Sequence, residues 1–243
     1  MLDRLAEAFA AQRAFIADAS HELRTPLTVI RGQLEVLAAH EQPDADEVRR
    51  VEMLVGAEIS RITRLVDDLL LLAQAERTDF LRVEPVPLEP FITDLWDGLA
   101  CTADRRFELG PIPAGTLRAD PDRLAQALRN LVRNAIAHTE PHTGLVRLEI
   151  EPAGGDELRF AVIDDGPGIP PAERERVFER FHRLDASRSR QYGGAGLGLA
   201  IVRAITDAHG GRVSALGRGD QPGVRMNLVL PGYVPVLPGY VAA

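Results

Sequence analysis

Ser20-His21-Glu22-Leu23-Arg24-Thr25-Pro26 lies in the middle of a long stretch of apolar residues with helical spacing. Apolar side chains recur at steps of three, four or seven, which predicts one amphipathic helix over about residues 3–39. Pro26 should interrupt this helix and bend it at the preceding turn. A carboxylate follows His21 directly, and the hydroxyl of Thr25 lies one turn beyond on the same face. These groups supply a nucleophile, a proton acceptor and a group that can orient water.

A second apolar stripe runs from Val51 to Ala73, after a polar break at residues 41–46. Two long helices joined by a short polar loop form an antiparallel hairpin. One hairpin cannot cover apolar stripes of this length, so we expect a homodimer in which two hairpins form a four-helix bundle. The alternative is a hairpin that packs on the C-terminal part of its own chain.

The pattern changes near Thr78, where short β-like runs alternate with helical stretches. The predicted strands are residues 80–86, 106–109, 116–119, 145–151, 158–163, 212–216 and 224–230. Strands in runs with a few helices between them indicate an α+β domain. The expected organisation is a helical hairpin at 1–77, an α+β domain at 80–231 and a tail at 232–243. The tail repeats Pro-Gly-Tyr-Val, and we expect it to be poorly ordered.

Composition excludes several classes of protein. The net charge of −8 disfavours nucleic acid as a partner, because binding a polyanion requires a basic face. No apolar run approaches the roughly 20 residues that span a bilayer, and no secretory signal is visible. The single cysteine, Cys101, excludes an internal disulfide and fits a reducing compartment. All 28 basic residues are arginine, so any cationic contact with phosphate must be a guanidinium group.

A further predicted helix carries two asparagines. Asp120 and Pro121 favour its start, as N-cap and first-turn residues. Asn130 and Asn134 lie one turn apart on a face different from its apolar face. Asn is a poor residue for a helix interior, so the pair suggests a polar cleft, and an amide oxygen is a competent Mg²⁺ ligand. Taken alone, such a pair is more often a surface feature than a metal site.

Two glycine-rich stretches follow. In Ile163-Asp164-Asp165-Gly166-Pro167-Gly168 a strand runs into a turn, where a carboxylate can accept a hydrogen bond from a base amine. In Gly193–Val202 a glycine-rich loop opens an apolar helix, which favours phosphate binding. The dinucleotide-binding fingerprint is excluded for the second stretch, because the preceding residues 183–192 are polar and rich in arginine rather than strand-like.

In this order, the motifs resemble those of two-component sensor histidine kinases. Residues 20–26 match the phosphoacceptor box, 130–139 the N box, 164–168 the first glycine box, 178–181 the F box and 194–198 the second glycine box. The ordered set covers nearly the whole chain. The resemblance implies a dimerisation and phosphotransfer hairpin followed by a Bergerat-type ATP-binding α/β sandwich.

The resemblance also implies roles. His21 would take the γ-phosphoryl group of Mg²⁺-bound ATP and pass it to an aspartate of a response regulator. Glu22 would act as general base or hold the imidazole tautomer, and Thr25 would position water for the reverse phosphatase reaction. Asn134 would bind Mg²⁺, and Asp164 would accept from the adenine amine. The implied nucleotide-binding residues are Asn130, Asn134, Asp164, Gly166, Gly168, Arg180, Arg183, Gly194, Gly196, Leu197 and Gly198.

Other residues near these motifs leave alternatives open. Phe178 and Phe181 resemble lid anchors, and Arg180, Arg183, Arg188 and Arg190 are possible phosphate contacts, at least half of which we expect to be solvated. An ATP-driven conformational machine of the gyrase or heat-shock-chaperone type would need a glutamate where Asn130 stands. A degenerate kinase that acts only as a scaffold or phosphatase is a third reading. The chain departs from the family pattern at Ala137, His138 and Ala195, where Lys, Tyr and Thr are frequent, and this bears on phosphate contacts and turnover rate.

The first residues already have a helical pattern without a start signal. We therefore expect the chain to be the cytoplasmic part of a membrane receptor, with a naturally soluble kinase as the alternative.

Overall fold

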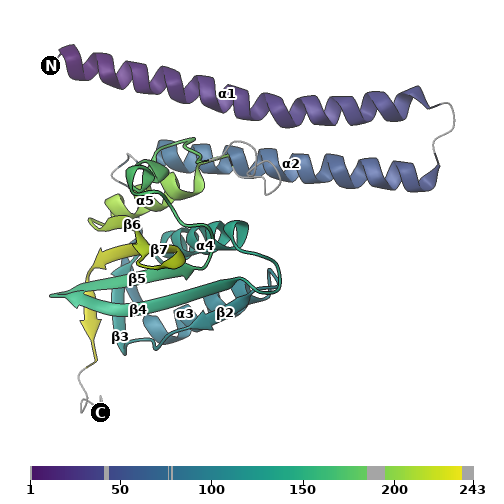
Figure 1. The fold of residues 1–243 in the computed structure, drawn as a ribbon. Coiled ribbons are helices and arrows are strands. Elements are labelled where there is room, and N and C mark those ends of the chain that lie inside the picture. Colours follow the sequence, from purple (N-terminus) through teal and green to yellow (C-terminus); the bar gives the residue numbers. More distant parts are fainter. Residues whose placement is uncertain (1, 41–43, 76, 78, 185–194, 237–243) are drawn as a thin grey trace.

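The computed structural model describes residues 2–40, 44–75, 77, 79–184 and 195–236, as a helical hairpin followed by an α/β sandwich (Figure 1). The hairpin consists of α1 (Leu2–Ala39) and α2 (Ala45–Gln74), which lie side by side as predicted. Asp44 caps α2, because its carboxylate accepts hydrogen bonds from the N–H groups of Asp46 and Glu47. The predicted span of the first helix is confirmed, since α1 continues through Pro26 as one helix of 38 residues, and the bend expected at the turn before Pro26 stays a prediction. Proline removes only one N–H donor from a helix, and the ring of Pro26 is buried.

The hairpin leaves many large apolar side chains exposed in the single chain. They are Ile16, Leu27, Val29, Leu34, Val36, Val48, Met53, Leu54, Ile59, Val66 and Leu70. The C-terminal part of α2 is covered instead by the sandwich, where Leu65, Leu71 and Leu72 join its apolar core. Apolar surface of the hairpin is therefore available both for a second hairpin and for the sandwich of the same chain.

The sandwich contains a five-stranded mixed sheet and a small three-stranded sheet. The large sheet has the order β2 (Arg106–Leu109), β4 (Leu145–Gly154), β5 (Glu157–Asp164), β7 (Gln221–Pro231) and β6 (Arg212–Arg218). Only the β2–β4 pair is parallel. The small sheet has the order β1 (Glu84–Pro87), β3 (Gly115–Ala119) and β8 (Tyr233–Pro235).

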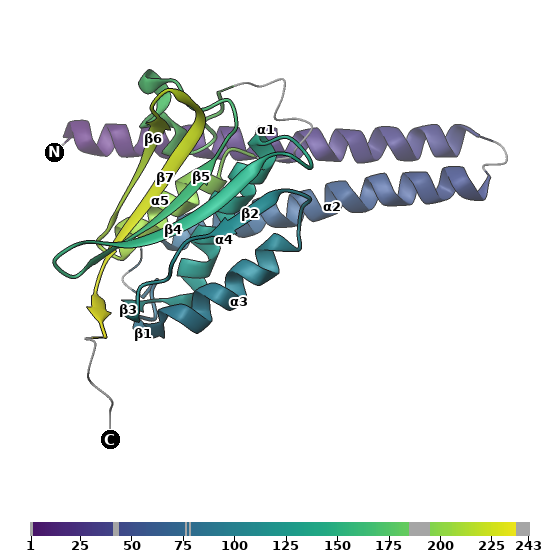
Figure 2. The same ribbon diagram turned by 60° about the horizontal axis from the view of Figure 1, so that its bottom comes forward.

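Helices cover one face of the large sheet (Figure 2). They are α3 (Leu88–Ala100), α4 (Pro121–His138) and α5 (Gly198–Ala208). Strand residues alternate between the two faces, so that Leu148, Phe160 and Leu228 are buried in the core. Two short 3₁₀ turns, Pro171–Glu173 and Arg176–Phe178, lie between β5 and α5.

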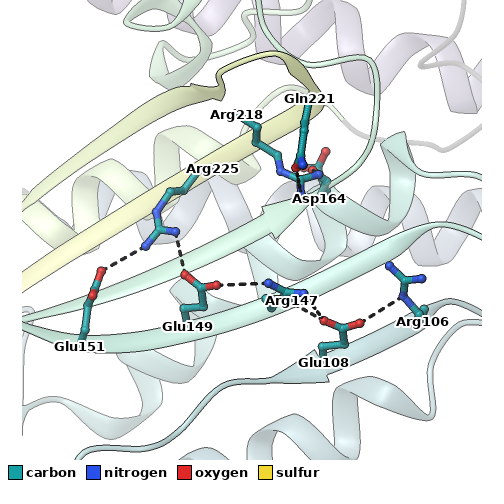
Figure 3. Close-up of polar contacts among 9 residues, drawn as sticks. All are labelled: Arg106, Glu108, Arg147, Glu149, Glu151, Asp164, Arg218, Gln221 and Arg225. Atoms are coloured by element: carbon teal, nitrogen blue, oxygen red, sulfur yellow. Dashed lines mark hydrogen bonds and ion pairs between the residues drawn. The ribbon is translucent and has the colours of Figure 1, made fainter.

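Charged side chains of alternating sign occupy the other face of the sheet (Figure 3). Arg147 pairs with Glu108 and Glu149, and Arg225 bridges Glu149 and Glu151. A hollow of about 440 Å³ lies among these residues, over β2 and β4. The three glutamates that line this hollow pair with arginines on the same or neighbouring strands.

Two predicted boundaries need correction. Of the strand predicted at 80–86, only Glu84–Pro87 forms β1, while Phe80 is buried ahead of it in the core. The tail predicted from residue 232 begins with β8, which pairs with β3. Tyr233 is buried there, and its hydroxyl donates to the carbonyl of Ala114 at 2.9 Å. The second Pro-Gly-Tyr-Val repeat lies outside the described residues.

Asp120 joins three segments of the sandwich. One carboxylate oxygen accepts from the N–H of Arg123 at 3.0 Å and caps α4, as predicted. The other accepts from the N–H of Arg82, in the segment before β1, at 2.8 Å. The N–H of Asp120 donates to Nε2 of His209, at the end of α5, while Nδ1 of His209 lies 2.8 Å from the carbonyl of Ile205. This arrangement requires neutral histidine, and burial lowers the pKa of His209 accordingly.

We expect Asp120→Ala to lower the free energy of unfolding of the sandwich by about 2 to 4 kcal/mol. The substitution removes a helix cap and leaves the partly buried N–H of Arg82 without its acceptor. Asp122→Ala, an exposed position in the same first turn, should cost less than about 1 kcal/mol. Urea unfolding followed by the fluorescence of Trp96, the single tryptophan and part of the core, measures both. Equal effects of the two substitutions would contradict the role given to Asp120.

Candidate functional site

His21 lies on α1 with its side chain exposed. The hydroxyl of Thr25 donates to the carbonyl of His21 at 3.3 Å, so the two residues lie one turn apart, as the sequence predicts. Thr28 makes the same kind of bond to Arg24, at 2.9 Å. The histidine is therefore open to a reaction partner from solvent or from another domain.

Glu22 faces α2 across the hairpin. Its carboxylate lies 3.8 Å from the guanidinium of Arg61, and the two side chains are only 22% and 19% exposed. Arg61 also lies 4.0 Å from Glu58, one turn earlier on α2. Arg61 was not predicted from the sequence, although a basic residue that interrupts an apolar stripe is a usable signal for an inward-facing charge.

The F box contacts α1 close to His21. The rings of Phe15 and Phe181 lie 5.9 Å apart, and the guanidinium of Arg180 lies 5.2 Å above the ring of Phe15. Arg180, expected as a phosphate contact, is thus placed against the hairpin. Arg183 is half-buried. Gly194, Arg188 and Arg190 lie outside the described residues.

Asp164 ends β5 and is 2% exposed. Its Oδ1 accepts from the N–H of Gly166 at 2.9 Å. Burial raises the pKa of Asp164 to about 6, although the N–H groups of Gly166 and Val224 and the charge of Arg218 oppose the shift. The adjacent Asp165 has a structural role, because its carboxylate accepts from the N–H of Leu145 at 2.8 Å.

Two glycines let this turn approach neighbouring backbone. A Cβ on Gly166 would lie 2.5 Å from the carbonyl oxygen of His138, the last residue of α4. Gly168 has a φ of +78°, and its added Cβ would lie 3.0 Å from the carbonyl of Gly223. The close approach at Gly166 brings the first glycine box against the C-terminal end of the N-box helix.

The second glycine box meets the F box and the N box. Gly196 has a φ of +73°, and its carbonyl accepts from the N–H of Phe181 at 3.0 Å. Leu197 is buried, and α5 begins at Gly198. A Cβ added to Gly198 would lie 3.9 Å from both Cγ and Oδ1 of Asn130. The N-terminal N–H groups of α5 therefore lie next to Asn130, where they favour an anion.

Asn130 and Asn134 differ in their surroundings. Asn130 is 7% exposed, and its Oδ1 accepts from Arg133 at 3.0 Å. Its Nδ2 is buried and has no hydrogen-bond partner among the described residues. Asn134 is half-buried one turn further along α4. Arg133, which lies inside the N box beside Asn134, was not predicted from the sequence.

A metal site built from protein side chains alone is not found. Within the described ranges, no three His, Cys, Asp or Glu side chains converge on one point. A Mg²⁺ ion held by one amide oxygen together with phosphate oxygens and water needs no such cluster, so the donor set fits the predicted kind of site.

Comparison with known proteins agrees with this arrangement. Residues 11–78 match the model of the His Kinase A (phospho-acceptor) domain. Residues 119–233 match the model of the histidine kinase-, DNA gyrase B- and HSP90-like ATPase. TcrY, a probable sensor histidine kinase of Mycobacterium tuberculosis, is 41% identical over 97% of this chain and 51% of its own length. The chain spans about a third to a half of the length of the curated relatives it matches.

Solved structures add the three-dimensional comparison. The mycobacterial sensor histidine kinase MprB matches over 64% of this chain and 100% of its own, with 31% identity and a TM-score of 0.55. The histidine kinase ThkA, solved in complex with the response regulator protein TrrA, matches over 93% of this chain and 64% of its own, with 25% identity and a TM-score of 0.73. Two domain models match this chain, and the chain covers the whole of the MprB structure at 31% identity. The chain therefore belongs to the family of two-component sensor histidine kinases.

Proposed function

We propose that this chain is an ATP-dependent protein-histidine kinase that phosphorylates His21 and passes the phosphoryl group to an aspartate of a response regulator. The observation that carries the proposal is the assembly around α4. Three motifs distant in sequence meet there: Asp164 with Gly166, the start of α5 at Gly198, and the buried Asn130. An exposed histidine on the adjoining hairpin supplies the acceptor that this nucleotide site requires.

Each end of ATP has its own set of residues in this proposal. The carboxylate of Asp164 accepts from the adenine amine, and Gly166 and Gly168 leave room for the base. Asn134 supplies an amide oxygen to Mg²⁺, which neutralises charge on the phosphates when bound. The phosphates lie against the N–H groups that open α5 at Gly198.

Transfer then depends on positioning and charge neutralisation. An unprotonated imidazole nitrogen of His21 forms a bond to the γ-phosphorus while the bond from that phosphorus to the bridging oxygen of ADP breaks. Glu22 accepts the proton of the other nitrogen, or holds it in place, so that the attacking nitrogen keeps its lone pair. Arg61, 3.8 Å from Glu22, balances the charge of this carboxylate inside the hairpin.

The proposal includes two protein partners. A second copy of the chain covers the exposed apolar residues of α1 and α2 and completes a four-helix bundle. The match to ThkA, solved with a response regulator protein, supports a receiver domain as the second partner. No described helix is long and apolar enough to cross a membrane. The similarity to sensor kinases about twice as long supports an origin as the cytoplasmic part of a membrane sensor.

The direct test is transfer of label from γ-³²P-ATP to the purified chain with Mg²⁺. His21→Ala should abolish labelling, because the acceptor nitrogen is gone. Asn134→Ala should reduce labelling by at least about a hundredfold, since the metal loses its protein ligand. His40 is an exposed histidine directly after α1, and His40→Ala is the matched control, which should label like the wild type. Label that remains on His21→Ala protein would refute the proposal.

Asp164→Asn should raise the stability of the folded chain at neutral pH and weaken its binding of nucleotide. The folded-state pKa of about 6 lies above the ordinary value of 3.8, so the carboxyl stabilises the fold when protonated, and this contribution is lost as pH rises through 6. The neutral variant should therefore be more stable than the wild type above pH 7, by up to about 3 kcal/mol, and should lose this advantage near pH 4. Its affinity for ADP should fall at least about tenfold at pH 7.5. Urea unfolding at several pH values and calorimetric titration measure the two effects, and a variant that is less stable at pH 7.5 would contradict the account.

Thr25→Ala should lose the reverse reaction while it keeps autophosphorylation, because the hydroxyl serves water rather than ATP in this proposal. Thr28→Ala is the control, since its hydroxyl bonds the backbone of α1 in the same way. The assay follows release of phosphate from a receiver domain that this kinase has first labelled. Unchanged release by Thr25→Ala would remove Thr25 from the mechanism.

A further inference from the structure

The hairpin of β6 and β7 lies against the end of β5, where Asp164 stands. A turn at residues 219–220 joins the two strands, and β7 then passes Asp164 at Gly223. Gly223 has a φ of +109°, and a Cβ added there would clash with the carbonyl oxygen of Asp164. The next residue, Val224, and Gly166 in the turn after β5 supply backbone N–H donors to the Asp164 carboxylate. The start of β7 therefore helps to position this carboxylate.

Arg218, the last residue of β6, ties this hairpin to β5 (Figure 3). Its Nη1 donates to the carbonyl of Asp164 at 3.1 Å and to the carbonyl of Pro222 at 3.1 Å. Its Nη2 donates to Oε1 of Gln221 at 2.9 Å. One half-buried, planar guanidinium group thus joins the end of β5 to the first residues of β7.

The guanidinium group also acts on the charge of Asp164. Burial raises the pKa of Asp164 to about 6, the charge of Asp165 adds to this shift, and the charge of Arg218 opposes it. An ionised carboxylate only accepts hydrogen bonds, whereas a carboxylic acid also donates one through its O–H group. Arg218 therefore favours the form of Asp164 that can accept from an amine with either oxygen.

We infer that Arg218 is a positioning residue of the nucleotide site, which fixes Asp164 for recognition of the adenine amine by bridging the ends of β5 and β7. The inference rests on the proposed function, because it takes Asp164 to accept from that amine. It gives the hairpin of β6 and β7 a part in base selectivity. Without Arg218, the site should distinguish less well between a purine with an amine and a purine with a carbonyl at the same position.

The test compares the affinities of the full chain for ADP and for inosine diphosphate, which carries a carbonyl in place of the adenine amine. Ribose and phosphates are the same in both, so a general loss of folding lowers both affinities alike. By calorimetric titration at neutral pH, the wild type should prefer ADP at least about tenfold, because the Asp164 carboxylate accepts from the amine and repels the carbonyl oxygen. Arg218→Met should reduce this preference about fivefold.

Three further variants serve as controls. Arg218→Lys keeps the charge and can donate to one carbonyl, so it should recover part of the lost preference. Arg212 is an exposed residue of the same strand and pairs with Glu157, the first residue of β5, so Arg212→Met should keep the preference within about twofold. Asp164→Asn should abolish the preference, because an amide can donate to the carbonyl as well as accept from the amine.

The pH dependence of the preference is a second measurement. In the wild type the preference should fall near pH 6, as Asp164 takes up a proton. In Arg218→Met the fall should occur about half a pH unit higher, because the charge that opposes protonation is gone. Arg212→Met should follow the wild type. A purely structural role of Arg218 would leave the pH of this fall unchanged.

The outcomes separate the two levels of the proposal. A wild-type chain that binds no ADP, or that binds both nucleotides equally well, would overturn the base-binding role of Asp164 in the proposed function. A wild-type preference that Arg218→Met retains, or loses only together with all nucleotide binding, would overturn only the inference about Arg218. An equal reduction of the preference in Arg212→Met would do the same.

Discussion

Helix α4 must bury an apolar face against the sheet and, within the same turns, hold the primary amide of Asn130 out of water. Leu124, Leu128 and Leu131 are fully buried, and Asn130 on the same helix is 7% exposed. Burying an amide is unfavourable unless its oxygen and its NH₂ group both find partners. Within the described protein only the oxygen has one, from Arg133. Both glycine boxes contact this helix, the first at the carbonyl of His138 and the second beside Asn130.

Two features around the proposed nucleotide site are energetically unfavourable in the folded chain: the buried carboxyl of Asp164 and the backbone conformation of Phe181. Burial of Asp164 raises its pKa to about 6, so its ionisation at neutral pH reduces the stability of the folded chain. The left-handed backbone of Phe181, at a φ of 60°, is a second cost, and it is held in place by the bond to Gly196. A ligand amine that donates a hydrogen bond to the Asp164 carboxylate would offset the first cost. The same segment joins the site to α1 through Phe15, so the binding site and the helix that carries His21 are in physical contact.

Features set by local chemistry were predictable from the sequence. The two long helices follow from their apolar spacing, and the start of α4 follows from the Asp120 cap. Strand β8 was missed because three residues carry no period, and its pairing depends on β3, far away in the chain. Arg61 and Arg133 were missed because their roles depend on which residue each faces in the folded chain. Helix α1 continues through Pro26, because the loss of one donor is tolerated within a long helix. The roles of Asn130, Asn134 and Asp164 remain predictions that rest on motif order and on the geometry around α4.

Hydrogen–deuterium exchange of the full chain, with and without ADP and Mg²⁺, tests the central claim most directly, because it locates the nucleotide without any substitution. The account predicts slower exchange on nucleotide binding in three separate segments: the C-terminal half of α4, residues 164–168 and residues 195–201. The distal parts of α1 and α2 should exchange at unchanged rates. Protection confined to β2 and β4, over the hollow on the charged face of the sheet, would contradict the claim that α4 organises the site.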